Sequence, residues 1–261
     1  MEYYKYLSDP FGIRKNGRIY LFCEEFDYRF NKGRIVYYEL GGPNPSGCKV
    51  AIELPVHMSY PYLLERAGEI YCIPETARAR EIMLFKAEEF PHKWVKCCKL
   101  VSDFPGLDNT VFEHGGRWWL ASVDLQQQAS LFIWHAPDMF GPWTPHSGNP
   151  VKRDIASVRS AGTPFVHHGF LYRPAQDCSR TYGGRIILNR ILRLTPDEFK
   201  EEPAALIEPF AGPYPYGLHT ISSLGKITLL DGKRFIFDKG QFKRSLRIGI
   251  NEVRSRLSEG K

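Results

Sequence analysis

Apolar and polar residues alternate in short segments along this 261-residue chain, and a glycine turn introduces each segment. The first segment, 16–22, reads Asn-Gly-Arg-Ile-Tyr-Leu-Phe, and similar segments follow at 67–73, 115–120, 168–172 and 231–237. A turn glycine followed by alternating aromatic and β-branched residues is typical of a hairpin that opens a strand. The pattern therefore predicts many short strands.

A second strand-like segment follows each of the first ones at a similar spacing. Its copies lie at 33–38, 80–85, 129–134, 184–188 and 244–249. Two strand positions that share one period of about fifty residues indicate a repeated structural unit. Five such units with three or four strands each predict an all-β fold, a single five-bladed β-propeller.

We expect one propeller domain over residues 1–261, because no linker-like segment divides the chain. Residues 1–6 are strand-like, and we expect them to close the ring by joining the last blade. The expected blades cover residues 7–55, 56–104, 105–155, 156–212 and 213–261.

Composition narrows the class of protein. With 43% hydrophobic and 25% charged residues the chain is typical of a soluble globular protein, and no apolar run is long enough to span a bilayer. The N-terminus lacks the pattern of a signal peptide, and the six cysteines form no C-x-x-C motif, so we expect a cytoplasmic protein with reduced thiols. The net charge of +6 comes from scattered residues, so no nucleic-acid partner is expected. The sequence carries no signal for the oligomeric state.

The first strand of each blade lines the central channel of a propeller. Eight residues before the turn glycine, the first four units carry Asp9, Tyr60, Asp108 and Ala161. Polar side chains also end the second strand of several units, and these are Glu24, Glu75, Gln176 and Asp177. The sequence therefore predicts a polar centre to which several blades contribute.

Three of these carboxyl groups are candidates for catalysis: Asp9, Asp108 and Glu75. Carboxylates that meet at one axis repel one another, so one of them keeps its proton to a higher pH. A protonated acid beside an ionised carboxylate is the pair that glycoside hydrolysis uses. The alternative is that these residues only serve turns, because Asp and Asn often do so at strand starts.

Other central residues are candidates for binding a ligand. Arg159 and Arg173 could hold a carboxylate or phosphate through paired hydrogen bonds, although Arg159 could instead neutralise the central aspartates. Two histidines could bind ligand or move protons, or be structural. These histidines are His57 and His219. The remaining binding candidates are Gln176 and Asp177 for sugar hydroxyls, Tyr60 for stacking, and Glu24. We expect no cofactor and no metal-ligand set, while His219 could face a structural cation on the axis.

Several segments resemble known families. The Asp-Pro at 9–10, Asp108 and Phe-Gly-Pro-Trp-Thr-Pro-His at 140–146 resemble the five-bladed propeller glycosidases, which include arabinanases and β-xylosidases. His-Met-Ser-Tyr-Pro at 57–61, Ile-Pro-Glu-Thr at 73–76 and the segment 172–179 more closely resemble one branch. That branch is the N-terminal propeller domain of plant glucosamine inositolphosphorylceramide transferases with its stand-alone bacterial relatives.

The glycosidase resemblance implies roles for individual residues. Asp9 matches the general base, and Asp108 matches the aspartate that orients the acid. The matching fourth-blade segment, 159–164, contains no Glu for the general acid, and Glu75 is the available substitute. We therefore expect a glycan-active enzyme, an inverting glycoside hydrolase acting on a hydroxyl-rich or anionic oligosaccharide or glycoconjugate. The alternatives are a non-catalytic glycan-binding propeller accompanying a glycosyltransferase, and a protein-interaction propeller.

Overall fold

The computed structural model describes residues 4–41 and 47–235, and its regular structure is almost entirely antiparallel β-sheet. The first sheet contains β1 (Lys5–Lys15), β2 (Arg18–Asp27), β3 (Lys32–Leu40) and β4 (Lys49–Ile52). The second contains β5 (Ser59–Arg66), β6 (Glu69–Glu75), β7 (Glu81–Glu89) and β8 (Lys93–Ser102), with a 3₁₀ turn, η1 (Ala77–Ala79), between β6 and β7.

The other three sheets continue in chain order. The third contains β9 (Gly106–His114), β10 (Arg117–Asp124), β11 (Gln127–Ala136), β12 (Thr144–Pro145) and β13 (Lys152–Arg153). The fourth contains β14 (Phe165–His167), β15 (Phe170–Asp177), β16 (Arg185–Leu194) and β17 (Phe199–Ile207). The last sheet has two described strands, β18 (Ile221–Leu224) and β19 (Ile227–Leu230).

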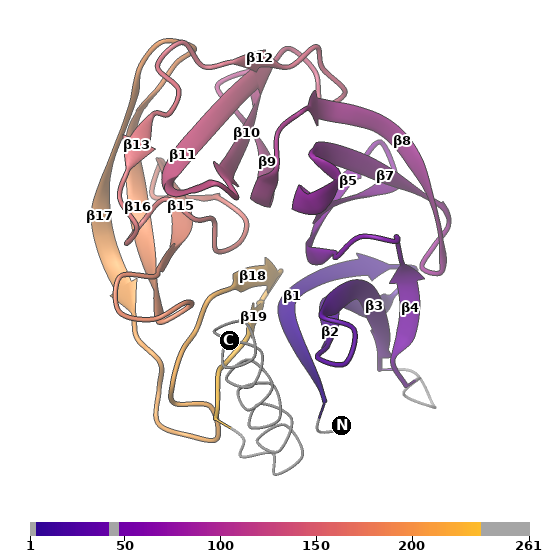
Figure 1. The fold of residues 1–261 in the computed structure, drawn as a ribbon. Helices are drawn as coiled ribbons and strands as arrows, with labels where there is room; N and C mark the ends of the chain where they lie inside the picture. Colours follow the sequence, from indigo (N-terminus) through magenta and orange to yellow (C-terminus); the bar gives the residue numbers. More distant parts are fainter. Residues whose placement is uncertain (1–3, 42–46, 236–261) are drawn as a thin grey trace, which may run out of the picture.

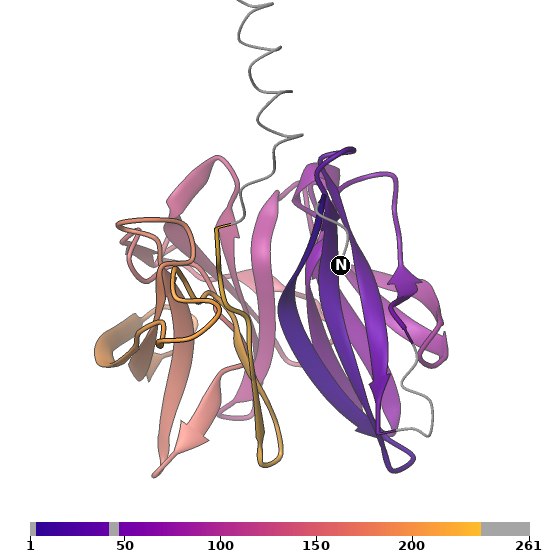
Figure 2. The same ribbon diagram turned by 90° about the horizontal axis from the view of Figure 1, so that it is seen from below.

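The sheets are arranged in a ring around a common centre (Figure 1). Four of them are full blades, and the β18–β19 hairpin lies between the fourth blade and β1, where a fifth blade belongs. Figure 2 shows the same hairpin standing beside β1. The fold is the predicted all-β propeller, and the strand expected at 244–249 lies outside the described residues. Within the described ranges, no helix is long and apolar enough to cross a bilayer.

The first four predicted turns join the first two strands of their blades. Asn16-Gly17, Ala67-Gly68, Gly115-Gly116 and His168-Gly169 all have positive φ, the backbone conformation that two-residue hairpins require. The fifth predicted turn, at Asp231-Gly232, is wrong. The hairpin of the last sheet turns at Gly225, which has a φ of 63°, and Asp231 directly follows β19.

The expected position of the N-terminal residues also needs correction. Lys5 and Tyr6 begin β1 and pair with Asp27 and Phe26 of β2, so they belong to the first blade and not to the last one. The first described strand, β1, is therefore an innermost strand of the ring.

Hydrophobic side chains fill the spaces between adjacent blades. One cluster joins Tyr20 and Phe22 of β2 to Ile70 and Cys72 of β6, and a second joins Leu131 of β11 to residues of the fourth blade. The aromatic residues that recur once per blade are expected to pack between blades. Tyr20, Tyr71 and Trp119 are buried in such clusters, whereas Tyr172 is only partly buried and Phe235 is 76% exposed, so the expectation is wrong for Phe235. Close packing of such side chains stabilises neighbouring blades against each other.

Gly162 links the fourth blade to the fifth position of the ring. Its backbone forms a parallel bridge with Ile221 at the start of β18, and the amide of Ile221 donates a hydrogen bond of 2.7 Å to the carbonyl of Ala161. Gly162 has a φ of 130°, and a Cβ atom there would lie 1.7 Å from the carbonyl oxygen of Ile221.

We therefore expect Gly162→Ala to lower the free energy of unfolding by about 3 kcal/mol or more, because strain and a backbone clash add together. Gly169→Ala is the matched control, since Gly169 also has positive φ but nothing within 4 Å of its Cβ position. It should cost only about 1 kcal/mol. Equal losses in urea unfolding of the two variants would contradict this account of how the ring closes.

Candidate functional site

Three inner strands carry a bulge at the same position, eight residues before the turn. Asp9, Tyr60 and Asp108 have φ values of 53°, 45° and 47°, and the pairing of β1, β5 and β9 shifts register around them. A bulge removes a residue from the ladder and leaves its amide without a strand partner. The polar centre is built on these freed amides.

A carboxylate accepts each freed amide. The amide of Tyr60 donates to Asp9 Oδ2 (3.2 Å), that of Asp108 to Glu75 Oε2 (3.2 Å), and that of Asp9 to Asp231 Oδ2 (3.1 Å). Each bond joins two different blades. The carboxyl groups therefore satisfy the backbone while they gather at the centre.

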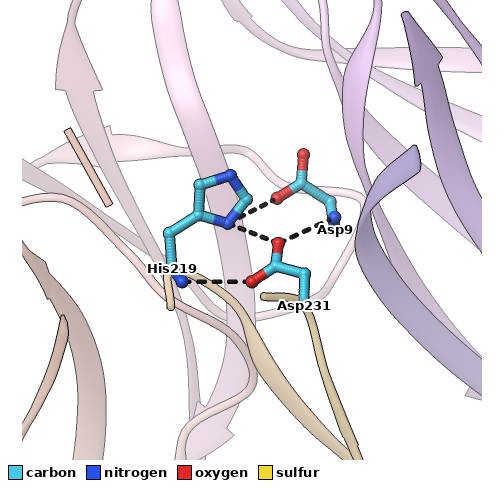
Figure 3. Close-up of side chains that lie close together, drawn as sticks. All are labelled: Asp9, His219 and Asp231. Carbon is cyan, nitrogen blue, oxygen red and sulfur yellow. Dashed lines mark hydrogen bonds and ion pairs between the residues drawn. The ribbon is translucent and has the colours of Figure 1, made fainter. Parts of the chain in front are cut away.

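Asp9, His219 and Asp231 form the first of two charged groups (Figure 3). His219 Nδ1 pairs with Asp231 Oδ2 and lies 3.7 Å from Asp9 Oδ1. The other oxygen of Asp231 accepts the backbone amides of His219 and Thr220, and the hydroxyl of Thr220 donates to Asp9 Oδ1 at 2.6 Å. The loop before β18 is thereby fixed against β1.

The charges of this group act on one another. Burial alone would lower the pKa of His219, but the carboxylates of Asp231 and Asp9 outweigh burial and raise the pKa to about 9. Burial raises the pKa of Asp9 to about 6 even though His219 opposes the shift. Burial would also raise the pKa of Asp231, but the His219 charge and hydrogen bonds from this loop hold it below its usual value. At neutral pH we therefore expect a protonated His219 between two ionised aspartates.

Asp108, Arg159, Gln176 and Glu75 form the second charged group. Arg159 Nε and Gln176 Nε2 both donate to Asp108 Oδ2, the latter at 2.8 Å. Arg159 Nη2 lies 3.8 Å from Glu75 Oε2. Burial and the neighbouring Asp108 raise the pKa of Glu75 to about 8, although Arg159 opposes the shift. Glu75 is therefore expected to be protonated at neutral pH.

Glu24 and His57 lie together at the edge of this centre. Ser8 donates to Glu24 Oε2 at 2.9 Å, while Glu24 Oε1 is buried without a hydrogen-bond partner among the described residues. His57 Nδ1 accepts the amide of Gly33, which leaves Nε2 3.9 Å from Glu24 Oε1. Burial raises the pKa of Glu24 well above its usual value and lowers the pKa of His57 to about 4, so His57 is expected to be neutral at pH 7.

Three residues that were predicted to bind a ligand, Arg173, Asp177 and Tyr60, contact protein groups and not an open site. The guanidinium of Arg173 is 1% exposed and holds both oxygens of Glu201 as well as the carbonyl oxygens of Ser157 and Val158. Its donors face protein groups, so it does not present a free site for an anion. Asp177 accepts hydrogen bonds from Ser179 in the following loop and from Arg185 at the start of β16.

Tyr60 does not present a stacking surface either. It is fully buried, its hydroxyl contacts Thr110 Oγ1 and accepts the amide of Gly162, and Phe11 packs on its ring. Tyr62, beside it, is also fully buried. Neither ring can lie against a sugar without the core opening.

Sequence reasoning missed Asp231, Thr220 and Tyr182. Asp231 was assigned to a turn, but it directly follows β19, six residues after the true turn glycine, Gly225. Glu24 and Glu75 lie seven residues after their own turn glycines, so a turn assigned at Gly225 would have placed Asp231 close to the matching position. Tyr182 lies in the loop between β15 and β16, which the repeat does not cover.

Asp9, His219 and Asp231 could also be read as a cation site. Each offers one ligand atom, and the three atoms lie within 4.8 Å of one another. A metal requires a deprotonated imidazole nitrogen. Because the raised pKa of His219 favours a proton between the two carboxylates, the group fits an internal ion-pair network better than a cation at neutral pH.

Comparison with known proteins places this chain in a family. Residues 3–209 match the family model described as glucosamine inositolphosphorylceramide transferase 1, N-terminal. The chain belongs to this family. The matched residues include Asp9, Glu75, Asp108 and Arg159, and the match ends before His219 and Asp231. The predicted family is thereby confirmed.

A curated relative agrees with this assignment, and solved structures share the fold. The glucosamine inositolphosphorylceramide transferase 1 of Oryza sativa subsp. japonica is 34% identical over 210 residues, which are 77% of this chain and 28% of the relative. The chain thus spans less than a third of that relative. Family 117 glycoside hydrolase Zg3597 of Zobellia galactanivorans aligns with a TM-score of 0.58 at 16% identity, over 83% of this chain and 72% of that one. A thermostable family-43 glycoside hydrolase aligns with a TM-score of 0.54 at 16% identity, over 78% and 77%. These structures share the fold.

The raised pKa of Glu75 predicts a pH-dependent stability. A carboxyl group that binds its proton more tightly in the folded chain stabilises the fold at low pH, and that contribution is lost as the pH rises from about 4.5 to about 8. Glu75→Gln imitates the protonated group, so the variant should gain stability relative to wild type over this range. Urea unfolding from pH 5 to pH 8.5 measures the difference.

The control for this series is Glu65→Gln, an exposed position on β5. Its difference from wild type should not change with pH. A constant difference for Glu75→Gln as well would show that Glu75 is ionised across the range and would contradict the assigned protonation.

Proposed function

We propose that this chain is a glycan-binding propeller whose centre takes a neutral, hydroxyl-rich sugar residue, and that it works alongside a glycosyltransferase. The main support for this proposal is that hydrogen-bond donors and acceptors from several blades lie together at one centre. Arg159 and His219 supply donors, and Asp9, Glu75 and Asp231 supply carboxyl oxygens. Sugar hydroxyls both donate and accept, so they suit such a mixture.

The charge balance of the centre favours a neutral sugar over an anionic one. Each central cation already faces a carboxylate: Arg159 faces Asp108 and the protonated carboxyl group of Glu75, and His219 faces Asp231 and Asp9. An anionic ligand would have to compete with these buried partners, and would leave a carboxylate unpaired. Arg173, the other predicted anion-binding residue, forms an ion pair with Glu201.

Similarity to known proteins supports the same function. The family is named for the N-terminal part of a glycosyltransferase, and the fold is shared with glycoside hydrolases. Glycan binding is the property common to both. It also requires no acid from the fourth blade, whose segment 159–164 contains no Glu.

We expect glucose and N-acetylglucosamine to bind the full chain in calorimetric titrations, and glucuronate to bind at least about tenfold more weakly. Asp9→Asn should weaken binding of the neutral sugars by about tenfold, because it removes a charged acceptor at the centre. Glu65→Gln, far from the centre on an exposed site, should leave binding unchanged. Tighter binding of glucuronate than of glucose would contradict the proposed charge preference.

A second candidate function is hydrolysis of a glycosidic bond, with inversion as the family resemblance implies. One observation favours it: burial raises the pKa of Glu75 to about 8 and that of Asp9 only to about 6. Near pH 7 the first would be an acid and the second a base, as the reaction requires.

Aryl glycosides separate the two functions. Glycan binding alone predicts no release of the aryl group by wild type above that of a double variant carrying Asp9→Asn and Glu75→Gln. Turnover by wild type that falls at least about a hundredfold in both single variants would replace the binding function with hydrolysis.

A further inference from the structure

Tyr182 is an exposed aromatic residue beside the central charged groups. The residue is 51% exposed and lies in the loop that joins β15 to β16. The guanidinium carbon of Arg159 lies 4.9 Å from the centre of its ring, and the ring of His219 packs against it edge-on, with 5.4 Å between the ring centres. Tyr182 thus bridges the two charged groups from the solvent side.

The phenol of Tyr182 is within electrostatic range of the central residues. Desolvation of the hydroxyl among the central residues raises the pKa of the phenol well above its usual value, and the charges of Arg159 and Asp108 also act on it. No hydrogen bond joins its hydroxyl to any residue in the described part of the chain, although its backbone carbonyl is bonded. The side chain therefore combines an exposed ring with a neutral hydroxyl that is free to bond a ligand.

The loop that carries Tyr182 is fixed to the last sheet. Lys233 Nζ donates to Thr181 Oγ1 at 3.2 Å and to the carbonyl of Tyr182 at 2.8 Å, and the amide of Leu218 donates to the carbonyl of Gly183 at 2.9 Å. Gly183 has a φ of 56°, and a Cβ there would lie 2.7 Å from His219 Cβ. An aromatic ring held in this way needs little ordering when a ligand binds.

We propose that Tyr182 is the sugar-contacting aromatic residue of this site: its ring packs against the C–H face of the bound sugar and its hydroxyl bonds a sugar hydroxyl. The inference rests on the proposed glycan-binding function. Tyr60 and Tyr62 are too deeply buried to stack against a sugar, whereas Tyr182 is exposed. The inference also places the sugar between Tyr182 and the carboxyl groups of Asp9 and Glu75.

The test uses the full chain and N-acetyl-D-glucosamine, with binding followed by calorimetry and by NMR of the sugar protons. Tyr182→Ala should weaken binding about tenfold, and Tyr182→Phe, which keeps the ring, about threefold. The matched control is Phe170→Ala. Phe170 is 47% exposed and also has an arginine, Arg190, 4.9 Å from its ring centre, but it lies at the opposite end of β15 from Gln176.

Ring contact has its own signature. Sugar C–H protons above an aromatic ring shift upfield, and this shift should persist in Tyr182→Phe, vanish in Tyr182→Ala and be unchanged in Phe170→Ala. Wild-type binding that Tyr182→Ala leaves intact, with the upfield shift retained, would overturn the role of Tyr182 while glycan binding stands. Failure of wild type to bind any sugar of the panel would overturn the proposed function, and this inference with it.

Discussion

The arrangement of the centre depends most on the hydrogen bonds of Asp9. Its carboxylate accepts the freed amide of Tyr60 in the second blade and the hydroxyl of Thr220 before β18, while its own amide donates to Asp231. One residue of the first blade thus binds both of its neighbours in the ring. The bulge with positive φ at Asp9 makes this possible, because it releases the amide from the strand ladder.

The same constraint recurs at Asp108, and together the two bulges concentrate acidic groups in a buried space. Such groups are tolerated only where cations and hydrogen bonds compensate them. His219 compensates Asp231 and Asp9, and Arg159 compensates Asp108. Structural stability and the proposed ligand preference therefore have one origin: among the described residues at the centre, the partners that allow the carboxylates to be buried also pair Arg159 and His219.

The sequence was informative where local rules decide the structure. Glycine turns with alternating strands predicted four hairpins and the propeller, because positive φ and strand period depend on neighbouring residues alone. The convergence of Asp9, Asp108, Glu75 and Arg159 followed from the repeat. The predictions that failed concern residues whose partners are distant in sequence. No residue near Arg173 in the sequence indicates that its guanidinium will pair with Glu201.

Two further errors arose in the last sheet and its loops. An Asp-Gly pair at 231–232 suggests a turn, whereas the turn forms at Gly225 and leaves Asp231 at the centre. Loops outside the repeat, such as the one carrying Tyr182, have no periodic signal to place them. Their position is set by contacts like those of Lys233, which only the folded chain brings together.

A crystal structure of the chain with bound N-acetyl-D-glucosamine would show directly whether a sugar binds at the centre of the propeller. We expect the sugar at the axis of the ring, with its hydroxyls on Asp9, Glu75 and Arg159 and its ring against Tyr182. A sugar bound elsewhere, for instance on the exposed aromatic residues Phe210 and Tyr214 of the loop before β18, would contradict it. In that case the central carboxyl groups would serve the fold alone.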